Sequence, residues 1–444
     1  MPAFLYPDSG CPSILAMTIK LLAAGDLHLG RRPGRLPDAV SGHAIDYAPA
    51  EAWQRLIDCA IGEDVDAVIL AGDVVESSRD YFEALPRLQR GIQQLAAAGI
   101  RTCLVSGNHD VEVLPRLIQR VPDAELLGAE GEWQAVEIYD RDRSDSVVLW
   151  GWSFPQPRVE RSPLVDFPGV RPGRLNVGVL HCDRDQLQSP YAPVSGQALA
   201  DSGVDIWLLG HIHQPDPLSV TSPYGYLGTV CGLDAGDPGP RGPWRIDVTN
   251  GEITRFEQRS LAPIQWTPLR VDLTGTDSVD GIEGRVLTAF EKALGTASGQ
   301  AAHAPDLYAL QLTLTGESDY TDGDVAAALP DRDQVHECPA GYVGQWFLER
   351  WTLETQPTIA LSQLARRDDQ PGLLARRLEI LARPATDPER QSILESAARV
   401  ANDAQRQGQW QRLPGQVPDA ETLAEWLQRR GLAALRAMLA AERD

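Results

Sequence analysis

The sequence predicts an α/β (α+β) fold built around a pair of sheets. Short apolar runs alternate with helical runs early in the chain, strand-like runs with short links follow, and several runs end in Asp, Asn or His. Alternating strands and helices predict parallel strands joined by right-handed crossovers. The carboxyl ends of such strands form the edge where α/β proteins keep their sites.

The first part of the chain predicts parallel strands separated by helices. Strands are predicted at residues 19–24, 65–71 and 100–105, and helices at residues 49–61 and 81–98. In both helices the apolar residues recur at helical spacing, which is typical of a helix that buries one face.

After residue 110 the pattern changes to strands with short or irregular links. They are predicted at residues 133–139, 147–152, 175–180, 206–209, 224–230 and 253–256. This order indicates a mixed sheet pair rather than a continuing doubly wound sheet. The chain has no Gly-x-Gly-x-x-Gly at a helix start and no Walker A sequence, so no nucleotide-cradling loop is predicted.

Composition divides the chain into four parts. Residues 1–17 are expected to be a disordered extension, because the first strand begins after them. Residues 18–262 form the expected main domain. Residues 263–356 are expected to form a small α+β capping domain, with strands at 269–273 and 307–314 and a helix at 282–294. Residues 357–444 are expected to be helical, with helices at 361–382 (broken at Pro371-Gly372), 388–407 and 420–443.

The charge is strongly acidic, with 62 Asp and Glu against 40 Lys and Arg and a net charge of −22. Such a surface repels nucleic acid at long range, so a phosphodiester substrate has to be held locally by metal ions and a few arginines. No apolar run is long enough to span a membrane. The six cysteines form no Cys-x-x-Cys pair, which favours a reducing cytoplasm.

Five motifs place metal-binding side chains at the ends of strand-like runs. Their candidate ligands are Asp26, His28, Asp73, Asn108, His181, His211 and His213. Carboxylate, amide and imidazole groups suit hard divalent ions such as Mn²⁺. If one carboxylate bridges, seven ligands hold two ions with four protein ligands each. Two such ions activate a water and clamp both oxygens of an in-line displacement.

Each motif taken singly has an ordinary structural explanation. Gly72-Asp73 after a strand is a common turn, and Asn108 is a turn-forming residue. A single histidine at a strand end is usually structural. The conjunction of five such segments in one order is what predicts a metal site.

These motifs resemble those of the calcineurin-like metallophosphoesterases over residues 18–260. The resemblance implies a two-sheet sandwich flanked by helices. It implies one metal held by Asp26, His28, Asp73 and His213, and a second held by Asp73, Asn108, His181 and His211. It also implies that His109 faces the scissile phosphate as a catalytic residue, with Asp110 orienting its ring.

Within that family, the sequences of the motifs resemble those of the SbcD-like DNA repair exonucleases, including YhaO-type relatives. The motifs are Asp-Leu-His-Leu-Gly, Ala-Gly-Asp-Val, Ser-Gly-Asn-His-Asp and Gly-His-Ile-His-Gln-Pro. This resemblance implies two Mn²⁺ ions, a DNA substrate, a coiled-coil ATPase partner of the SbcC or YhaN kind, and scope for a homodimer. Relatives often carry His or Asp three residues after the bridging Asp, where this chain has Glu76. Arg31, Arg32 and Arg184 are candidates for phosphate contacts.

The sequence therefore predicts a cytoplasmic two-metal phosphodiesterase, a DNA exonuclease or endonuclease subunit in DNA repair. One alternative is a phosphatase or nucleotide phosphodiesterase that acts on small substrates. Another is a scaffold or regulatory subunit of an ATPase complex with a vestigial nuclease. The complete ligand set favours an enzyme over the scaffold.

Overall fold

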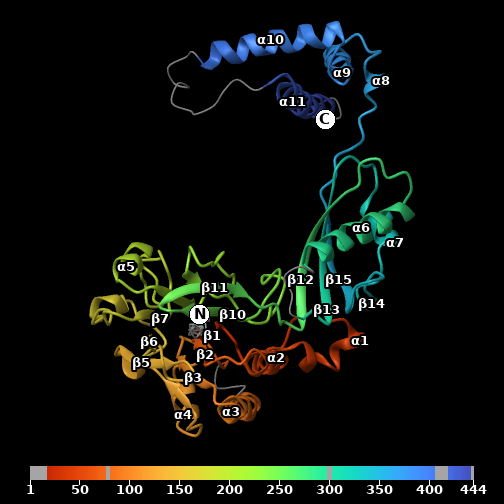
Figure 1. Cartoon of the computed structure of the whole chain (residues 1–444). Coiled ribbons are helices and arrows are strands. Elements are labelled where there is room, and N and C mark those ends of the chain that lie inside the picture. Colours follow the sequence, from red (N-terminus) through yellow and green to blue (C-terminus); the bar gives the residue numbers. More distant parts are fainter. Residues whose placement is uncertain (1–17, 77–80, 298–302, 406–418, 442–444) are drawn as a thin grey trace, which may run out of the picture. The chain divides into compact units, whose positions relative to one another are not determined.

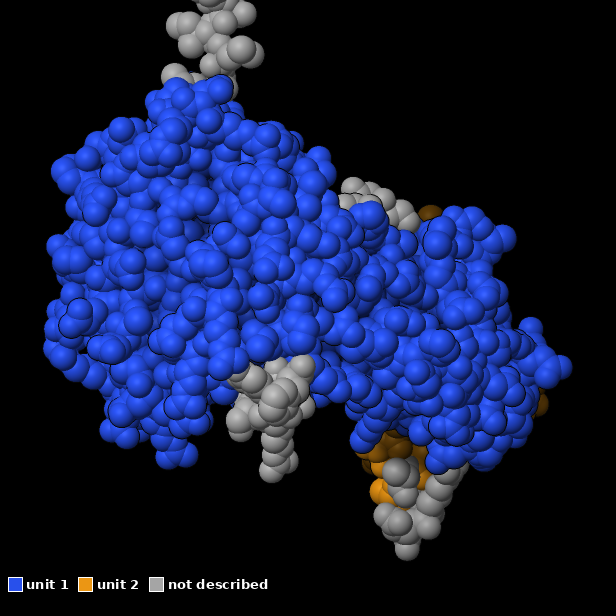
Figure 2. All heavy atoms as spheres, turned by 90° about the horizontal axis from the view of Figure 1, so that it is seen from below, with its two compact units in different colours: residues 1–316, 320–355 blue, residues 317–319, 356–444 orange. Residues whose placement is uncertain are grey.

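The computed structural model describes residues 18–76, 81–297, 303–405 and 419–441. The chain forms two compact units (Figure 2): Met1–Gly316 with Tyr320–Thr355, and Glu317–Asp319 with Gln356–Asp444. The extension predicted over residues 1–17 lies outside the described residues. None of the described helices is long and apolar enough to cross a membrane.

Six strands form the first sheet, in the order β11-β10-β1-β2-β3-β4 (Figure 1). Parallel neighbours make up one part of it: β1 (Thr18–Ala24), β2 (Ala67–Ala71), β3 (Arg101–Val105) and β4 (Ala124–Leu126). Two antiparallel strands extend it: β10 (Trp244–Thr249) and β11 (Glu252–Gln258). Every residue of β2 is buried, as expected for a continuous apolar run in a parallel sheet.

Helices α2 (Pro49–Gly62) and α3 (Tyr81–Ala97) pack on this sheet. Helix α2 begins at Pro49, whose fixed φ angle suits the first helical turn. Its Trp53 and Leu56 share one hydrophobic cluster with Leu88 and Ile92 of α3. Both predicted helices are confirmed, and their apolar stripes are the buried faces.

Five strands form the second sheet, in the order β5-β6-β7-β8-β9. They are β5 (Gln134–Tyr139), β6 (Ser146–Trp152), β7 (Leu175–His181), β8 (Ile206–Gly210) and β9 (Tyr224–Tyr226). Short helices connect the strands of the two sheets: α1 (Asp38–Ser41), η1 (Ala44–Tyr47), α4 (Leu114–Ile118), η2 (Ala129–Gly131), η3 (Pro163–Asp166) and α5 (Gly196–Asp201).

The two sheets pack face to face through one hydrophobic cluster that includes Ile69 and Val105 of the first sheet and Leu149 and Val179 of the second. This confirms the predicted α/β fold with a pair of sheets flanked by helices. Strands β6, β7 and β8 are parallel to one another, as are β1, β2 and β3. The ring of His181, at the end of β7, lies 3.1 Å from the carbonyl oxygen of Ala71, at the end of β2. The carboxyl ends of both parallel sets therefore share one edge.

A third sheet, in the order β12-β13-β15-β14, belongs to the same unit. It consists of β12 (Ile264–Asp272), β13 (Leu307–Thr315), β14 (His336–Glu337) and β15 (Gln345–Leu353), with helices α6 (Asp280–Ala297) and α7 (Asp322–Ala328). It has its own hydrophobic cluster around Phe290 and Leu310. Trp266 and Phe347, however, join the cluster of helices α2 and α3. That residues 263–356 act as a cap stays a prediction.

The second unit is helical and has its own small core. Its helices are α8 (Leu361–Leu364), α9 (Gln370–Leu381), α10 (Pro388–Gln405) and α11 (Ala420–Ala441). Leu378 of α9, Leu394 of α10 and Leu435 of α11 are buried together. Arg390 donates two hydrogen bonds to Glu421, at 3.2 and 2.7 Å, and links α10 to α11.

The structure corrects two parts of the predicted element pattern. The helical stretch expected at residues 361–382 does contain a break, but the break lies at residues 365–369 and not at Pro371-Gly372. Pro371 stands in the first turn of α9, and the side chain of Asp369 caps that helix by accepting from the Gly372 N–H at 2.9 Å. Strands β4, β10, β14 and β15 were not predicted. In β10 the signal was present, since Trp244, Ile246 and Val248 alternate with polar residues and face the core.

Candidate metal centre

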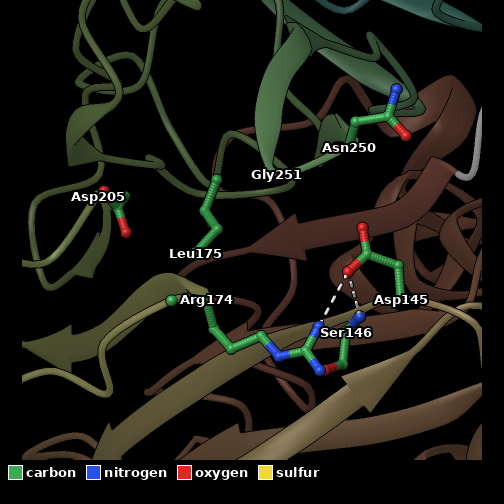
Figure 3. A pocket seen from close by; sticks show the side chains of 8 residues that line it. Asp145, Ser146, Arg174, Leu175, Asp205, Asn250 and Gly251 are labelled. Atoms are coloured by element: carbon green, nitrogen blue, oxygen red, sulfur yellow. Dashed lines mark hydrogen bonds and ion pairs between the residues drawn. The ribbon is translucent and has the colours of Figure 1, made fainter.

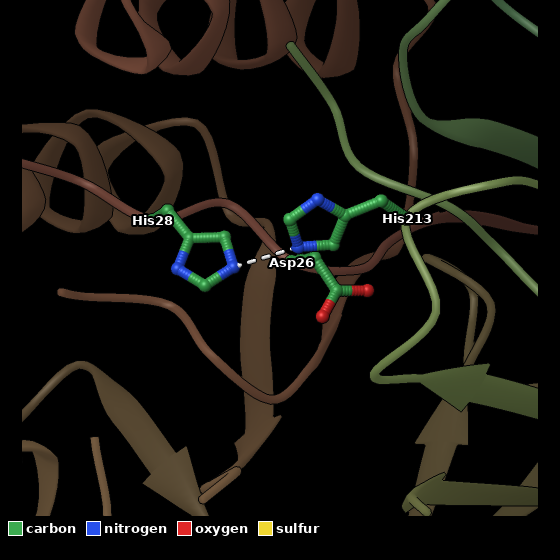
Figure 4. A group of neighbouring side chains, drawn as sticks. All are labelled: Asp26, His28 and His213. Carbon is green, nitrogen blue, oxygen red and sulfur yellow. Dashed lines mark hydrogen bonds between the residues drawn. The ribbon is translucent and has the colours of Figure 1, made fainter. Parts of the chain in front are cut away.

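The predicted ligands converge at the shared carboxyl edge of the two sheets. Asp26, His28, Asp73 and His181 are buried there. Side chains of Asp26, His28 and His213 form one group with ligand atoms within 4.8 Å of one another (Figure 4). Asp26, Asp73 and His181 form a second such group. The two groups share the buried carboxylate of Asp26, whereas the predicted bridging residue was Asp73. Asp73 Oδ2 lies 4.0 Å from His28 Nε2 and 3.3 Å from His181 Nε2, so it also stands between the two groups. Two clusters joined by a buried carboxylate can hold two neighbouring divalent ions.

The tautomers of His28 and His213 indicate that a cation belongs between them. Their Nε2 atoms face each other at 3.1 Å (Figure 4), while each Nδ1 faces a carboxylate: Glu76 at 3.0 Å and Asp237 at 3.3 Å. A neutral imidazole whose Nδ1–H donates to a carboxylate carries a lone pair on Nε2. Two facing lone pairs repel each other, and a metal ion between them removes that repulsion.

His181 has the same arrangement on the other side of the site. Its Nδ1 donates to the Ala71 carbonyl oxygen, and its Nε2 faces Asn108 Oδ1 at 3.1 Å and Asp73 Oδ2 at 3.3 Å, both acceptors. Burial opposes a charge on this ring, but Asp73 outweighs it and raises the pKa of His181 to about 9. The position therefore demands positive charge, which a proton or a metal ion supplies. Metal binding would displace that proton.

Carboxylates outside the predicted ligand set orient three of the histidines. Asp237 accepts from His213 Nδ1, and Glu76 accepts from His28 Nδ1. Asp183 Oδ1 lies 3.3 Å from His211 Nε2, so the predicted metal contact of this ring would use Nδ1. Such partners fix the tautomer and the ring orientation of metal-binding histidines. We did not predict Asp183 and Asp237, because common loop aspartates give no distinctive sequence signal.

The backbone at the site is strained. Asp26, His28, Asp73 and His211 all have positive φ angles, of 45°, 47°, 47° and 101°. Residues with a Cβ rarely adopt this region, and such strain concentrates at functional sites. Hydrogen bonds hold it in place, from the His28 N–H to the Asp73 carbonyl at 2.8 Å and from the His211 N–H to Asp26 Oδ1 at 3.0 Å.

Glycines in two of the motifs are required by close packing. A Cβ at Gly107 would lie 2.1 Å from Asp73 Oδ1, and one at Gly72 would lie 2.5 Å from His181 Nδ1. Gly72 also has a φ of 87°, which suits glycine. Gly72 and Gly107 therefore let neighbouring ligand loops approach each other.

His109 stands beside the ligands with its ring half-exposed. Its Nδ1 lies 3.2 Å from Glu76 Oε1, and its backbone N–H donates to Asp73 Oδ1 at 3.0 Å. The hydrogen bond to Glu76 raises the pKa of His109, although burial opposes this. The hydrogen bonds of His109 and His28 hold the pKa of Glu76 well below its usual range. One carboxylate therefore joins a predicted metal ligand to the predicted catalytic histidine.

Asp110 does not have the contact we expected. It is fully buried and accepts from the Val74 N–H at 2.7 Å and from the Gly107 N–H at 2.8 Å, so it braces two ligand loops. Burial and the nearby Asp73 raise the pKa of Asp110 to about 8. The prediction that Asp110 orients the His109 ring is wrong, because Glu76 occupies that place.

The three candidate arginines differ in their surroundings. Arg31 Nε lies 3.8 Å from Glu76 Oε2, beside the site. Arg32 pairs with Glu83 at 3.3 Å on the surface. Arg184 pairs with Asp216 at 2.9 Å and lies over the Tyr226 ring. Phosphate contacts of all three remain predictions.

Comparison with known proteins agrees with the geometry. A family model described as calcineurin-like phosphoesterase matches residues 19–215. The chain is 25% identical to the uncharacterized metallophosphoesterase YhaO of Bacillus subtilis over 296 residues, which are 62% of this chain and 68% of that protein. It is 26% identical to the DNA double-strand break repair protein Mre11 of Haloferax volcanii over 282 residues, which are 60% of this chain and 58% of that protein.

Among solved structures, the calcineurin-like phosphoesterase YfkN of Bacillus subtilis overlaps with 64% of this chain and 99% of that chain, at 12% identity and a TM-score of 0.34. All seven expected ligands and His109 lie within the residues that the family model matches. They stand together at the joined edge of two sheets, with imidazoles and carboxylates aimed at one another. Residues 19–215 of this chain are therefore similar to the calcineurin-like phosphoesterases, and the similarity is to a domain of that kind.

Proposed function

We propose that this chain hydrolyses phosphodiester bonds of DNA with two divalent metal ions, as a nuclease subunit in DNA repair. The observation that carries the proposal is a half-exposed histidine, His109, held by Glu76 directly beside buried metal-binding groups. Hydrolysis of a phosphodiester needs positive charge at the phosphoryl oxygens and an acid for the leaving oxygen. The similarity to a protein described as a DNA double-strand break repair protein supports DNA as the substrate.

Manganese is the metal we propose, because carboxylate and imidazole ligands suit this ion. One ion would be held by Asp26, His28, Asp73 and His213, and the other by Asp73, Asn108, His181 and His211. When bound, the ions would act as Lewis acids on the phosphoryl oxygens and lower the pKa of a bound water. Asp237, Asp183 and Glu76 would keep the imidazoles in the tautomers that bind metal.

His109 is the proton donor in this proposal. The hydrogen bond to Glu76 raises the pKa of His109 and so favours the protonated imidazole. With Nδ1 engaged by Glu76, Nε2 remains to deliver a proton to the leaving oxygen. Arg31, beside Glu76 and 42% exposed, is placed to meet a phosphate oxygen of the substrate.

The test compares three substrates with the purified full chain and added Mn²⁺: bis-p-nitrophenyl phosphate, p-nitrophenyl phosphate and labelled duplex DNA. We expect metal-dependent cleavage of the diester and of DNA, with little activity on the monoester. Preference for the monoester would favour a phosphatase, and cleavage of the diester without DNA would favour an enzyme on small substrates. No activity on any of them would favour a scaffold with a vestigial nuclease.

The helical second unit belongs to the proposal as the docking element for a coiled-coil ATPase of the SbcC or YhaN kind. Leu373, Val400 and Trp426 are large apolar residues that this unit leaves 47%, 70% and 53% exposed. These residues lie on three helices, α9, α10 and α11, and exposed apolar side chains on helices can pack against a partner helix. A homodimer is the second assembly that we propose to test, by light scattering.

We also propose the cytoplasm as the location. Cys59, Cys103, Cys182, Cys231 and Cys338 are free thiols, and three of them are buried. A reducing compartment suits free thiols.

A further inference from the structure

We infer that a cavity beside the catalytic loop is a binding site for a nucleobase, and that it takes the amino-bearing base next to the scissile phosphate. We call it the side cavity; it measures about 420 Å³, and its apolar walls are Val111, Pro115, Ile118, Leu126, Phe154 and Pro155. The inference rests on the proposed function, because the base belongs to the nucleic acid that the metal centre would cleave.

The side cavity lies at the same sheet edge as the metal centre. Ser106 follows β3, Leu126 ends β4 and Phe154 follows β6, and all three line it. Strands β3 and β4 are parallel, so their carboxyl ends meet at one edge. Ser106 precedes the ligand Asn108 by two residues, which sets their Cα atoms at most ~7 Å apart. The lining of the cavity therefore comes within about this distance of a predicted metal ligand.

Hydrogen bonds make the wall between cavity and metal centre rigid. The Ser106 N–H donates to Ser153 Oγ at 2.9 Å, and the Ser153 hydroxyl donates to the Leu127 carbonyl at 2.6 Å. The ring of Phe154 stands 5.8 Å from the ring of His181, at 80° to it. Because this wall is already formed and contacts a predicted metal ligand, little conformational entropy is lost there when a substrate binds.

The chemistry of the lining selects a flat, uncharged group. No lysine or arginine lines the cavity, so it offers nothing to a phosphate. Its rim carries Gln119 and Glu130, whose exposed side chains have no hydrogen-bond partner among the described residues. A carboxylate accepts from an exocyclic amine, and an amide both donates and accepts, which are the groups that read a base edge. Adenine, cytosine and guanine carry such an amine, whereas thymine offers none.

The backbone of the turn that carries Glu130 has an unusual conformation. Glu130 has a φ of 64°, between Gly128 at 67° and Gly131 at 80°. A Cβ at Gly128 would lie 2.5 Å from the Gly151 carbonyl oxygen, so this turn packs tightly on β6. A strained non-glycine residue at a cavity rim is typical of a functional position.

A second cavity, of about 360 Å³, lacks this relation to the metal centre (Figure 3). It is lined by residues that begin strands β6 and β7, including Ser146 and Leu175, and therefore lies at the opposite sheet edge. Its one arginine, Arg174, pairs with Asp145 at 3.2 Å (Figure 3). Its position and its paired charge give no reason to assign a ligand.

The first test measures inhibition of bis-p-nitrophenyl phosphate hydrolysis by the full chain with Mn²⁺. The probes are dAMP, dCMP, dTMP and base-free deoxyribose 5-phosphate. We expect dAMP and dCMP to inhibit about 10-fold more tightly than deoxyribose 5-phosphate, and dTMP to lie between them. Glu130→Gln should remove the advantage of dAMP over dTMP. Equal inhibition by all four probes would overturn the inference.

The second test fills the cavity. Ala129 lines it and is exposed, so Ala129→Trp places an indole there without entering the core. We expect dAMP inhibition to weaken about 10-fold more than deoxyribose 5-phosphate inhibition. The matched control is Ala97→Trp at the exposed end of α3, which should change neither. If Ala129→Trp weakens inhibition by dAMP and by deoxyribose 5-phosphate equally, the cavity does not bind the base.

Calorimetry of dAMP and deoxyribose 5-phosphate with the Mn²⁺-loaded chain separates this inference from the proposed function. If the chain hydrolyses nothing but binds dAMP in a manner that Ala129→Trp weakens, the proposed function fails and the base site stands. If it cleaves DNA but binds both compounds equally, the base site fails and the proposed function stands.

Discussion

At the scale of single residues, the central feature is that Glu76 serves two histidines. Its Oε2 holds His28, a predicted metal ligand, and its Oε1 holds His109, the predicted acid. The two oxygens of Glu76 therefore join the candidate metal centre to the histidine that we propose as the proton donor.

Removing the ring of His109 separates catalysis from metal binding. His109→Ala should retain both ions and lower turnover of bis-p-nitrophenyl phosphate by ~10²–10⁴-fold, the usual contribution of a general acid. Steady-state kinetics and elemental analysis of the same sample measure this. Loss of metal from the variant would make His109 a ligand instead.

Glu76→Gln should shift the pH profile of the same reaction. Glu76 raises the pKa of His109, and the reaction needs His109 protonated, so activity falls as pH rises through that pKa. Without the carboxylate the pKa of His109 drops, and the alkaline limb of kcat/KM should move to lower pH. If the alkaline limb does not move but the metal content falls, Glu76 would act only on the metal site through His28 and not on His109.

The outer carboxylates should tune the two ions separately. Asp237 contacts His213 and Asp183 contacts His211, and these histidines belong to different predicted metal sites. Asp237→Asn and Asp183→Asn should each lower the affinity for one Mn²⁺ ion by ~10–100-fold in calorimetric titrations. The affinity for the other ion should stay unchanged. The control is Asp201→Asn on the surface of α5. If each variant weakened both ions equally, the two sites would not be independent.

At the scale of elements, the site depends on how strands end rather than on how they run. Four loops with positive φ residues or close-packed glycines follow β1, β2, β3 and β8, and hydrogen bonds between loops hold them together. Asp110 is part of this bracing, because it accepts from one N–H in its own loop and one in the loop after β2. The sheets supply a rigid base that lets such strained loops persist.

The tail helices depend on a small core, which makes one leucine costly. Leu378 of α9 is 3% exposed and packs against α11, where a Cβ at Gly431 would lie 2.7 Å from it. Leu378→Ala should destabilise this unit by about 2–5 kcal/mol, seen as earlier loss of helical circular dichroism and faster proteolysis of the tail. Leu373→Ala, on the same helix but 47% exposed, should change stability by less than about 1 kcal/mol. Equal effects of the two variants would contradict the internal core.

At the scale of the whole molecule, the contacts assign metal centre and tail to different units. All residues of the metal centre belong to the first unit, and helices α8 to α11 belong to the second. The tail is close to neutral, whereas acids outnumber bases in the rest of the chain. This division fits a catalytic body and a separate docking element.

Truncation after Thr358 should separate the two roles. We expect the shortened chain to keep Mn²⁺-dependent cleavage of bis-p-nitrophenyl phosphate, since every described contact of the metal centre lies before that point. We expect it to lose co-purification with a coiled-coil ATPase. An insoluble product, or one that still binds the ATPase, would show that the tail is no docking element.

The sequence by itself determined the fold class and singled out the candidate ligands. Asp26, His28, Asp73 and His181 are recognisable because each follows an apolar run, and parallel strands bring such ends to one edge. The buried faces of helices α2 and α3 were also predictable, because apolar residues at helical spacing lie on one side of a helix.

Only the tertiary structure decided which groups orient those ligands. Glu76 meets His109 across 33 positions, and Asp183 and Asp237 meet histidines that lie on other loops. A carboxylate in a loop carries no periodic signal, and its partner depends on which strand ends become neighbours. Asp110 shows the same limit: its neighbour in sequence, His109, suggested a ring contact, but folding buried its carboxylate against two backbone N–H groups. A buried carboxylate takes the donors that enclose it, and only the packed chain sets those.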